Sequence, residues 1–136
     1  ETPTIAAIST PLSVGAIGLV RLSGPEAVAI AGRVFRPIGR RTLETVPGYS
    51  AIYGHAVAGE EVLDEVVVFL YRAPRSYTGE DVVEFSCHGG PYLLQRVLRA
   101  LLDAGAVPAQ AGEFTKRAFL NGKMPSPPPS PTWPPT

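Results

Sequence analysis

The sequence predicts a mixed α/β (α+β) domain, in which a mixed β-sheet packs with about three helices. One observation is a series of short strand-like segments, either continuously apolar or alternating with a period of two. A second is a pair of such segments, 49–57 and 61–73, joined by a short Gly-containing turn in a β-hairpin pattern. A third is the segment 91–104, in which leucines recur at helical spacing.

The composition limits the number of domains and the kind of partner. A chain of 136 residues has the size of one domain. Its 12 basic and 12 acidic residues cancel, which argues against a phosphate backbone or an anionic membrane surface as the main partner. Cys87 is the single cysteine, so a disulfide framework is excluded and no metal site is expected. No apolar run approaches the ~20 residues that span a bilayer and no signal peptide is visible, so we expect a reducing, cytoplasmic location.

The first part of the chain has the pattern of two strands followed by a helix. The segments 4–9 and 17–23 are expected to be strands, with the Pro/Gly loop TPLSVGA between them. Ser23 stands three residues before Glu26, a spacing that predicts a capping box at the start of a helix. The buried face of this helix is expected to carry Val28, Ala31, Val34 and Phe35.

The second hairpin strand and the strand that follows it differ in their patterns. Val66–Tyr71 shows little alternation, which predicts a central strand covered on both faces. Asp81–His88 alternates, so that Glu84 and His88 share one face and Cys87 lies on the other. We expect both strands in one sheet, backed by the helix of 91–104.

The C-terminal part is expected to hold two helices and a short edge strand. Gly105 is placed to end the first helix, AVPAQA to form the edge strand, and Gly122 to end a helix within GEFTKRAFLNGK. The proline-rich segment 124–136 is expected to be an extended or disordered tail, with a polyproline ligand as the alternative. The apolar stripe of the first helix consists of Leu94, Val97, Leu98, Leu101 and Leu102.

Two charged residues stand in strands that are otherwise apolar. Burying the carboxylate of Glu84 in a valine-rich strand is costly unless hydrogen-bond donors surround it, and Arg21 raises the same problem in its own strand. Both could face solvent, pair with each other across the sheet, or bind a ligand. Cys87 and His88 are adjacent on a strand and point to opposite faces, so a thiol–imidazole pair is not expected and Cys87 is interpreted as a core residue.

Four stretches together carry a resemblance to a known family. They are IAAISTP, GAIGLVRLSGP, VLDEVVVFLYRAPRSYTGEDVVEFSCHGGP and AGEFTKRAFLNGK. In this order, over about residues 4–123, they resemble the N-terminal domain of the MnmE (TrmE) family of tRNA-modification GTPases. The resemblance implies that residues 1–123 form a folate-binding and dimerisation domain, similar to the folate-binding module of glycine-cleavage aminomethyltransferase, and that 124–136 are a tail.

The same resemblance implies a ligand, partners and three site residues. The ligand is 5-formyltetrahydrofolate or a related tetrahydrofolate, and the partners are a second copy of the chain and the flavoprotein MnmG. The family modifies the wobble uridine of tRNA at C5. Arg21, Glu84 and Lys123 match the family's folate-binding positions in VRLSG, GEDVVE and FLNGK. A carboxylate such as Glu84 can accept the paired N–H groups of a pterin, and the two cations suit the carboxylates of the glutamate tail.

The sequence also departs from the family. No P-loop, helical domain or C-terminal cysteine motif follows, so we expect the chain not to be catalytic alone and to hold no catalytic residue; GTP, magnesium and potassium belong to the missing GTPase domain. A truncation, a reading-frame error or a divergent gene would each account for the proline tail. The alternative function is a dimerisation scaffold without folate binding. Tight binding of tRNA by this domain is not expected, because the net charge is zero.

Overall fold

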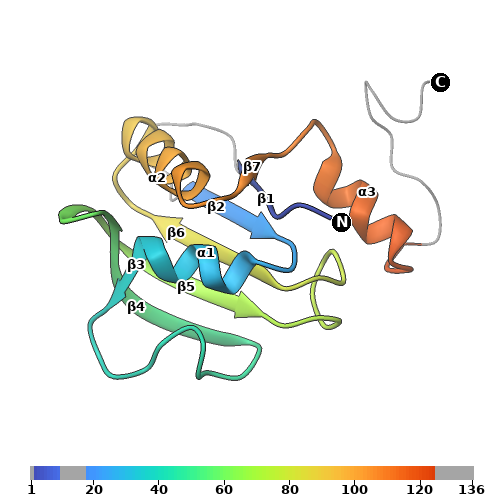
Figure 1. The fold of residues 1–136 in the computed structure, drawn as a ribbon, viewed down its shortest axis with the longest axis horizontal. Helices are drawn as coiled ribbons and strands as arrows, with labels where there is room; N and C mark the ends of the chain where they lie inside the picture. The colour runs from blue at the N-terminus through green and yellow to red at the C-terminus, as the bar shows by residue number, and fades with distance from the viewer. Residues whose placement is uncertain (1, 10–17, 125–136) are drawn as a thin grey trace.

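The computed structural model describes residues 2–9 and 18–124, which form one mixed β-sheet and three helices (Figure 1). This confirms the predicted fold class. The predicted loop TPLSVGA and the tail from Pro125 onward lie outside the described residues. The elements are β1 (Ile5–Ile8), β2 (Gly18–Ser23), α1 (Ala27–Val34), β3 (Phe35–Pro37), β4 (Ser50–Ala58), β5 (Glu61–Tyr71), β6 (Val82–Cys87), α2 (Pro91–Asp103), β7 (Val107–Pro108) and α3 (Glu113–Leu120).

The sheet has the strand order β3-β4-β5-β6-β2-β1-β7. All neighbours pair antiparallel except β1 and β7, which are parallel and make the sheet mixed. The hairpin of β4 and β5 and the edge strand β7 are as predicted, whereas the short strand β3 was not expected. Phe35 begins β3 in an extended conformation, rather than lying on the helix before it.

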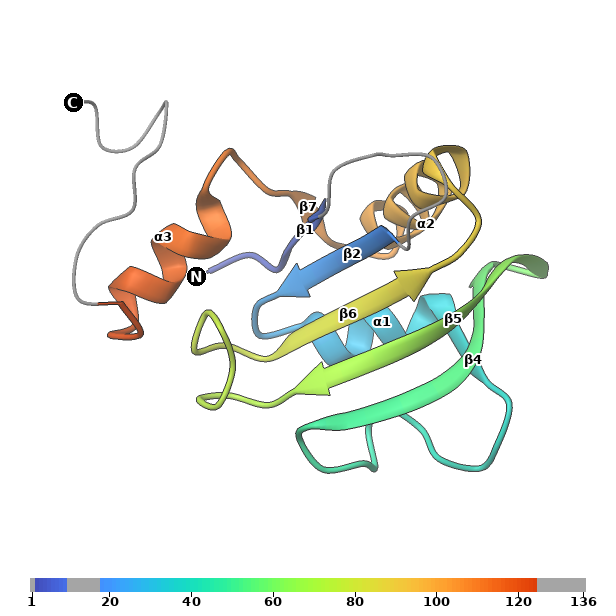
Figure 2. The same cartoon turned by 180° about the vertical axis from the view of Figure 1, so that it is seen from behind.

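Helices α1 and α2 cover the same face of the sheet, as the two opposite views show (Figures 1 and 2). Between them and the sheet lies the core, which includes Phe85 and Cys87 of β6 and Leu94, Val97 and Leu101 of α2. Burial along β5 alternates, so the prediction that Val66–Tyr71 is covered on both faces is wrong. Figure 2 shows the reason: neither α1 nor α2 lies over the second face of β4, β5, β6 and β2.

The start of α1 differs from the predicted capping box. Ser23 does not cap the helix, because its hydroxyl bonds to Thr78 and Glu80 instead. The backbone N–H of Glu26 donates to Thr4 Oγ1 at 2.8 Å, so a residue just before β1 supplies the cap. The error has a physical cause: two competing partners for the Ser23 hydroxyl come from a loop 55 to 57 residues away in sequence.

The two later helices end as the glycine positions predict. After α2, the N–H of Gly105 donates to Leu102 O and that of Ala106 to Leu101 O, the bond pair of a Schellman motif. Gly122 ends α3 in the same way, and both glycines have positive φ. No helix in the described part of the chain is long and apolar enough to cross a membrane.

Candidate ligand-binding site

Arg21 and Glu84 lie opposite each other in the centre of the sheet. They are register partners on β2 and β6, and Arg21 Nε donates to Glu84 Oε2 at 2.7 Å. Both side chains are largely buried, with exposed fractions of 23% and 14%. Of the alternatives that the sequence leaves open, the structure therefore shows the cross-sheet ion pair, on the face that α1 and α2 do not cover.

Two aromatic rings hold the guanidinium of Arg21. Its Cζ atom lies 5.6 Å from the ring centroid of Tyr77 and 5.5 Å from that of Phe114. Tyr77 belongs to the loop of residues 72–81 and Phe114 to the first turn of α3, and the Tyr77 hydroxyl is 2.9 Å from Thr115 Oγ1. These two cation–π contacts and the hydrogen bond to Glu84 limit the movement of the guanidinium.

A cavity of about 380 Å³ adjoins this arginine. Its wall includes Arg21, Tyr77, Phe114 and Thr115, with main chain from β1 and from the segment before α3. Arg21 Nη1 and Nη2 have no hydrogen-bond acceptor among the described residues, while Nε is used by Glu84. The cavity thus combines aromatic surface with a guanidinium whose remaining N–H groups can bind an anion.

Lys123 is not brought to this pair. It is exposed, it follows the C-terminal end of α3, and it does not line the cavity. Lys123 follows the end of α3 at Leu120, whereas Phe114 lies in its first turn, and the N–H of Lys123 donates to Ala118 O at 2.8 Å. Glu84 does not line the cavity either, because Arg21 covers it on that side.

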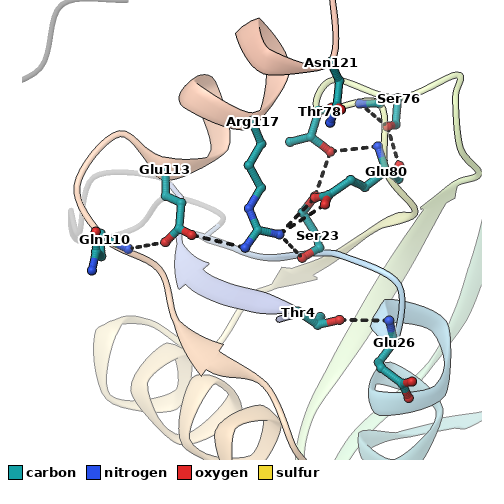
Figure 3. Close-up of polar contacts among 11 residues, drawn as sticks. Thr4, Ser23, Glu26, Ser76, Thr78, Glu80, Gln110, Glu113, Arg117 and Asn121 are labelled. Atoms are coloured by element: carbon teal, nitrogen blue, oxygen red, sulfur yellow. Dashed lines mark hydrogen bonds and ion pairs between the residues drawn. The ribbon is translucent and has the colours of Figure 1, made fainter. Parts of the chain in front are cut away.

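A network of polar side chains attaches α3 to the loop of residues 72–81 (Figure 3). At its centre, Arg117 Nη1 contacts both carboxylate oxygens of Glu80 at 3.1 and 3.2 Å, and Arg117 Nη2 donates to Glu113 at 3.1 Å. Ser23 Oγ donates to Glu80 Oε1 at 2.6 Å. The sequence interpretation missed these residues, although the Glu113–Arg117 pair has the i,i+4 spacing of a helical ion pair.

The turn from β6 to α2 uses its glycines structurally. Asp64 Oδ2 accepts hydrogen bonds from the N–H groups of His88 and Gly89, at 2.8 and 2.9 Å. Gly90 precedes α2 with φ of 86°, a conformation that favours glycine. These N–H groups therefore bind the chain's own carboxylate. Among the described residues, no cluster of three or more His, Cys, Asp or Glu is placed to hold a metal ion.

Cys87 is a core residue, as predicted, and burial raises the pKa of its thiol to about 12, with a smaller contribution from the charge of Asp64. We expect a thiol reagent to leave Cys87 unmodified at pH 8 in the native protein and to modify it in denaturant. The ordinary pKa is 9.0, so this group stabilises the fold below pH 9 and the contribution is lost as pH rises toward 12. Rapid modification of the native protein would contradict this.

The structure is thus an α/β domain with a cavity lined by a cation and two aromatic rings, and the comparisons with known proteins give its family. Residues 4–123 match the family described as "GTP-binding protein TrmE N-terminus". The chain is 53% identical over 126 residues to the tRNA modification GTPase MnmE of Shouchella clausii. The aligned residues make up 91% of this chain and 27% of that protein. It is 52% identical over 121 residues to MnmE of Chlorobaculum tepidum, and this alignment covers 88% of this chain and 26% of that protein.

The chain belongs to the MnmE (TrmE) family, and it corresponds to the N-terminal domain. This confirms the resemblance stated from the sequence. The chain spans about a quarter of the length of these curated relatives.

Proposed function

We propose that this chain is a tetrahydrofolate-binding, dimerising module of a GTPase that takes part in modifying the wobble uridine of tRNA. The observation that carries the proposal is the guanidinium of Arg21, which contacts two aromatic rings, lines a cavity and has two nitrogens without an acceptor among the described residues. A reduced folate combines a pterin heterocycle with a benzoyl ring and carboxylates. Aromatic surface and a guanidinium fork are the groups that bind such parts.

Within this proposal, Arg21 binds a negatively charged or carbonyl oxygen of the ligand. The cavity volume of about 380 Å³ lies near the lower end of the ~300–1,000 Å³ range of small-molecule sites. It therefore suits one end of an elongated molecule such as 5-formyltetrahydrofolate, with the other end outside it.

The hydrogen bond from Arg21 narrows the role that Glu84 can take toward a ligand. Since Oε2 already accepts from Arg21, Oε1 is the oxygen without a hydrogen bond to that arginine and is proposed to accept from an N–H group of a pterin. Glu84 also fixes the orientation of Arg21. Lys123 is proposed to meet a carboxylate outside the cavity, at the far end of α3 from Phe114.

The wider activity belongs to a larger protein. The relatives are named tRNA modification GTPases, and this chain matches about a quarter of their length. We propose that the domain supports tRNA modification with the flavoprotein MnmG, in the cytoplasm, and that GTP, magnesium and potassium act in a different domain.

Calorimetric titration of the chain with 5-formyltetrahydrofolate tests the proposal. We expect saturable binding with one site per chain, because the described site is built from residues of one chain. Folic acid is a useful comparison, since its oxidised pterin ring is flat and lacks the formyl group. Absence of heat and of any ligand-induced shift in melting temperature would contradict folate binding and favour the scaffold alternative.

The uncovered sheet face supports the dimerisation part of the proposal. It carries half-buried Val67 and Phe69 of β5 and the exposed Tyr53 of β4, which a second copy could cover. We expect sedimentation to show a dimer, and Val67→Lys to weaken it at least tenfold, because a cation would lie in an apolar contact. Tyr92→Lys, at an exposed position of α2 on the other side of the sheet, is the control. A monomer at high micromolar concentration would exclude dimerisation.

A further inference from the structure

Helix α3 carries a wall of the candidate site but has little apolar surface to hold it in place. Its only buried residues are Ala118 and the charged Arg117. It packs closely against no other helix or strand in the described part of the chain, and both views show it apart from α1 and α2 (Figures 1 and 2). Few apolar side chains of α3 are fully buried, so its polar contacts are expected to contribute much of what holds it in place.

Several residues that make these contacts lie on one face of α3. Phe114, Arg117, Ala118 and Asn121 have the spacing of a single helical face. The loop of residues 72–81 runs along this face: Tyr77 meets Thr115 at one end, and Thr78 O accepts from Asn121 Nδ2 at 2.8 Å at the other. A Cβ atom added at Gly79 would lie 2.9 Å from Asn121 Cβ, so the loop and the helix are in direct contact there.

Arg117 joins the middle of this face to the end of strand β2. Only 8% of Arg117 is exposed, and its guanidinium contacts Glu80, Glu113 and the carbonyl of Ser23, the last at 3.4 Å (Figure 3). Glu80 is held from the other side by the hydroxyl of Ser23. Arg117, Glu80 and Ser23 thus form one contact between α3, the 72–81 loop and β2, to which α3 contributes Arg117.

The geometry of this link relates it to the ligand site. Ser23 and Arg21 are two residues apart on β2, so they share a face and are about 6.8 Å apart. Arg117 and Phe114 are three residues apart on α3, about 4.5 Å along its axis. Fixing Arg117 against Ser23 therefore places Phe114 over Arg21, as observed.

We propose that Arg117 is a positioning residue for the ligand site. Acting through Glu80 and Ser23, it keeps α3 and the 72–81 loop in register with β2, so that Phe114 and Tyr77 remain stacked on Arg21. The role in ligand binding rests on the proposed function, whereas the effect on Arg21 does not. The competing interpretation is that Arg117 only adds stability and leaves the surroundings of Arg21 unchanged.

The test is the NMR signal of the Arg21 Nε–H group, in the chain labelled with ¹⁵N. This group is hydrogen-bonded to Glu84 and lies beside two rings, whose ring currents shift its proton resonance. Phe114→Leu gives the reference shift when one ring is absent. We expect Arg117→Gln to move the Arg21 signal toward that reference. Arg117→Lys should return the signal part of the way to its wild-type position, because a lysine ammonium can pair with one carboxylate but lacks the planar set of donors of a guanidinium.

The control is Arg99→Gln, which removes an exposed ion pair with Asp103 on α2 and should leave the Arg21 signal unchanged. If Arg117→Gln does not fold, Glu80→Gln weakens the same link while keeping the Arg117–Glu113 pair. An Arg21 signal at its wild-type position in a folded variant of this link would overturn the proposal.

Ligand binding gives the second measurement. If the wild-type chain binds 5-formyltetrahydrofolate, we expect Arg117→Gln to lose affinity by about tenfold, the size of one lost cation–π contact. Unchanged affinity would overturn the positioning role in binding. If the wild-type chain does not bind, the proposed function fails, and the Arg21 signal still decides whether Arg117 positions the site.

Discussion

Replacing Arg21 with glutamine is expected to weaken binding of 5-formyltetrahydrofolate about hundredfold. The guanidinium lines the cavity and has two nitrogens without an acceptor among the described residues, and a charge-assisted hydrogen bond to a partly buried group is worth about 1.5–3 kcal/mol. Glutamine can replace one of these donors but carries no charge. Calorimetric titration of the variant beside the wild type measures the loss.

The matched control for this substitution is Arg96→Gln. Arg96 of α2 forms a two-pronged ion pair with Glu61, with both N–O distances 2.8 Å, and it does not line the candidate cavity. The same chemical change there should leave the affinity unchanged. Equal affinity of folded Arg21→Gln and wild-type protein would show that the guanidinium does not bind the ligand.

The strands and helices could be predicted because their signals are local. The alternation of residues 81–88 and the leucine spacing of α2 follow from burial on one side of each element, and the structure buries Phe85, Leu94 and Leu101 accordingly. Gly105 and Gly122 mark helix ends because the positive φ required there favours glycine. The residues that form the core can thus be predicted from patterns within single strands and helices.

What the sequence could not show depends on contacts between distant segments. The partner of the Ser23 hydroxyl was misjudged because Thr78 and Glu80 compete with the helix for it. The continuous apolar run of β5 looked buried on both faces, yet its second face is left uncovered by α1 and α2.

In the candidate site, too, local signals could be read from the sequence and contacts between distant segments could not. Arg21 and Glu84 could be singled out as charges in apolar strands, but only the register of β2 with β6 brings them together. Phe114 and Tyr77 carry no signal of their role, because their contact with Arg21 requires α3 and the 72–81 loop to meet over β2. Lys123, matched by motif, is exposed and does not line the cavity beside Arg21.

Leu101→Ala is expected to cause the largest loss of stability. Leu101 is fully buried between α2 and the sheet, and removing such a side chain costs about 2–5 kcal/mol, including the cavity left behind. Since domains of this size are stable by about 5–15 kcal/mol, much of the total would be lost. We expect the melting temperature to fall by about 10 °C or more, with the denaturant midpoint falling in parallel.

Leu120→Ala separates this burial effect from any general effect of shortening a helical leucine. Leu120 ends α3 and is 65% exposed, so the same substitution removes almost no buried surface there. Alanine is also the better helix former, which works against any loss at either site. Both variants should be compared at one protein concentration, because dimerisation would add its own stabilisation. If Leu101→Ala unfolded with the same free energy as Leu120→Ala, the packing of α2 against the sheet described here would be wrong.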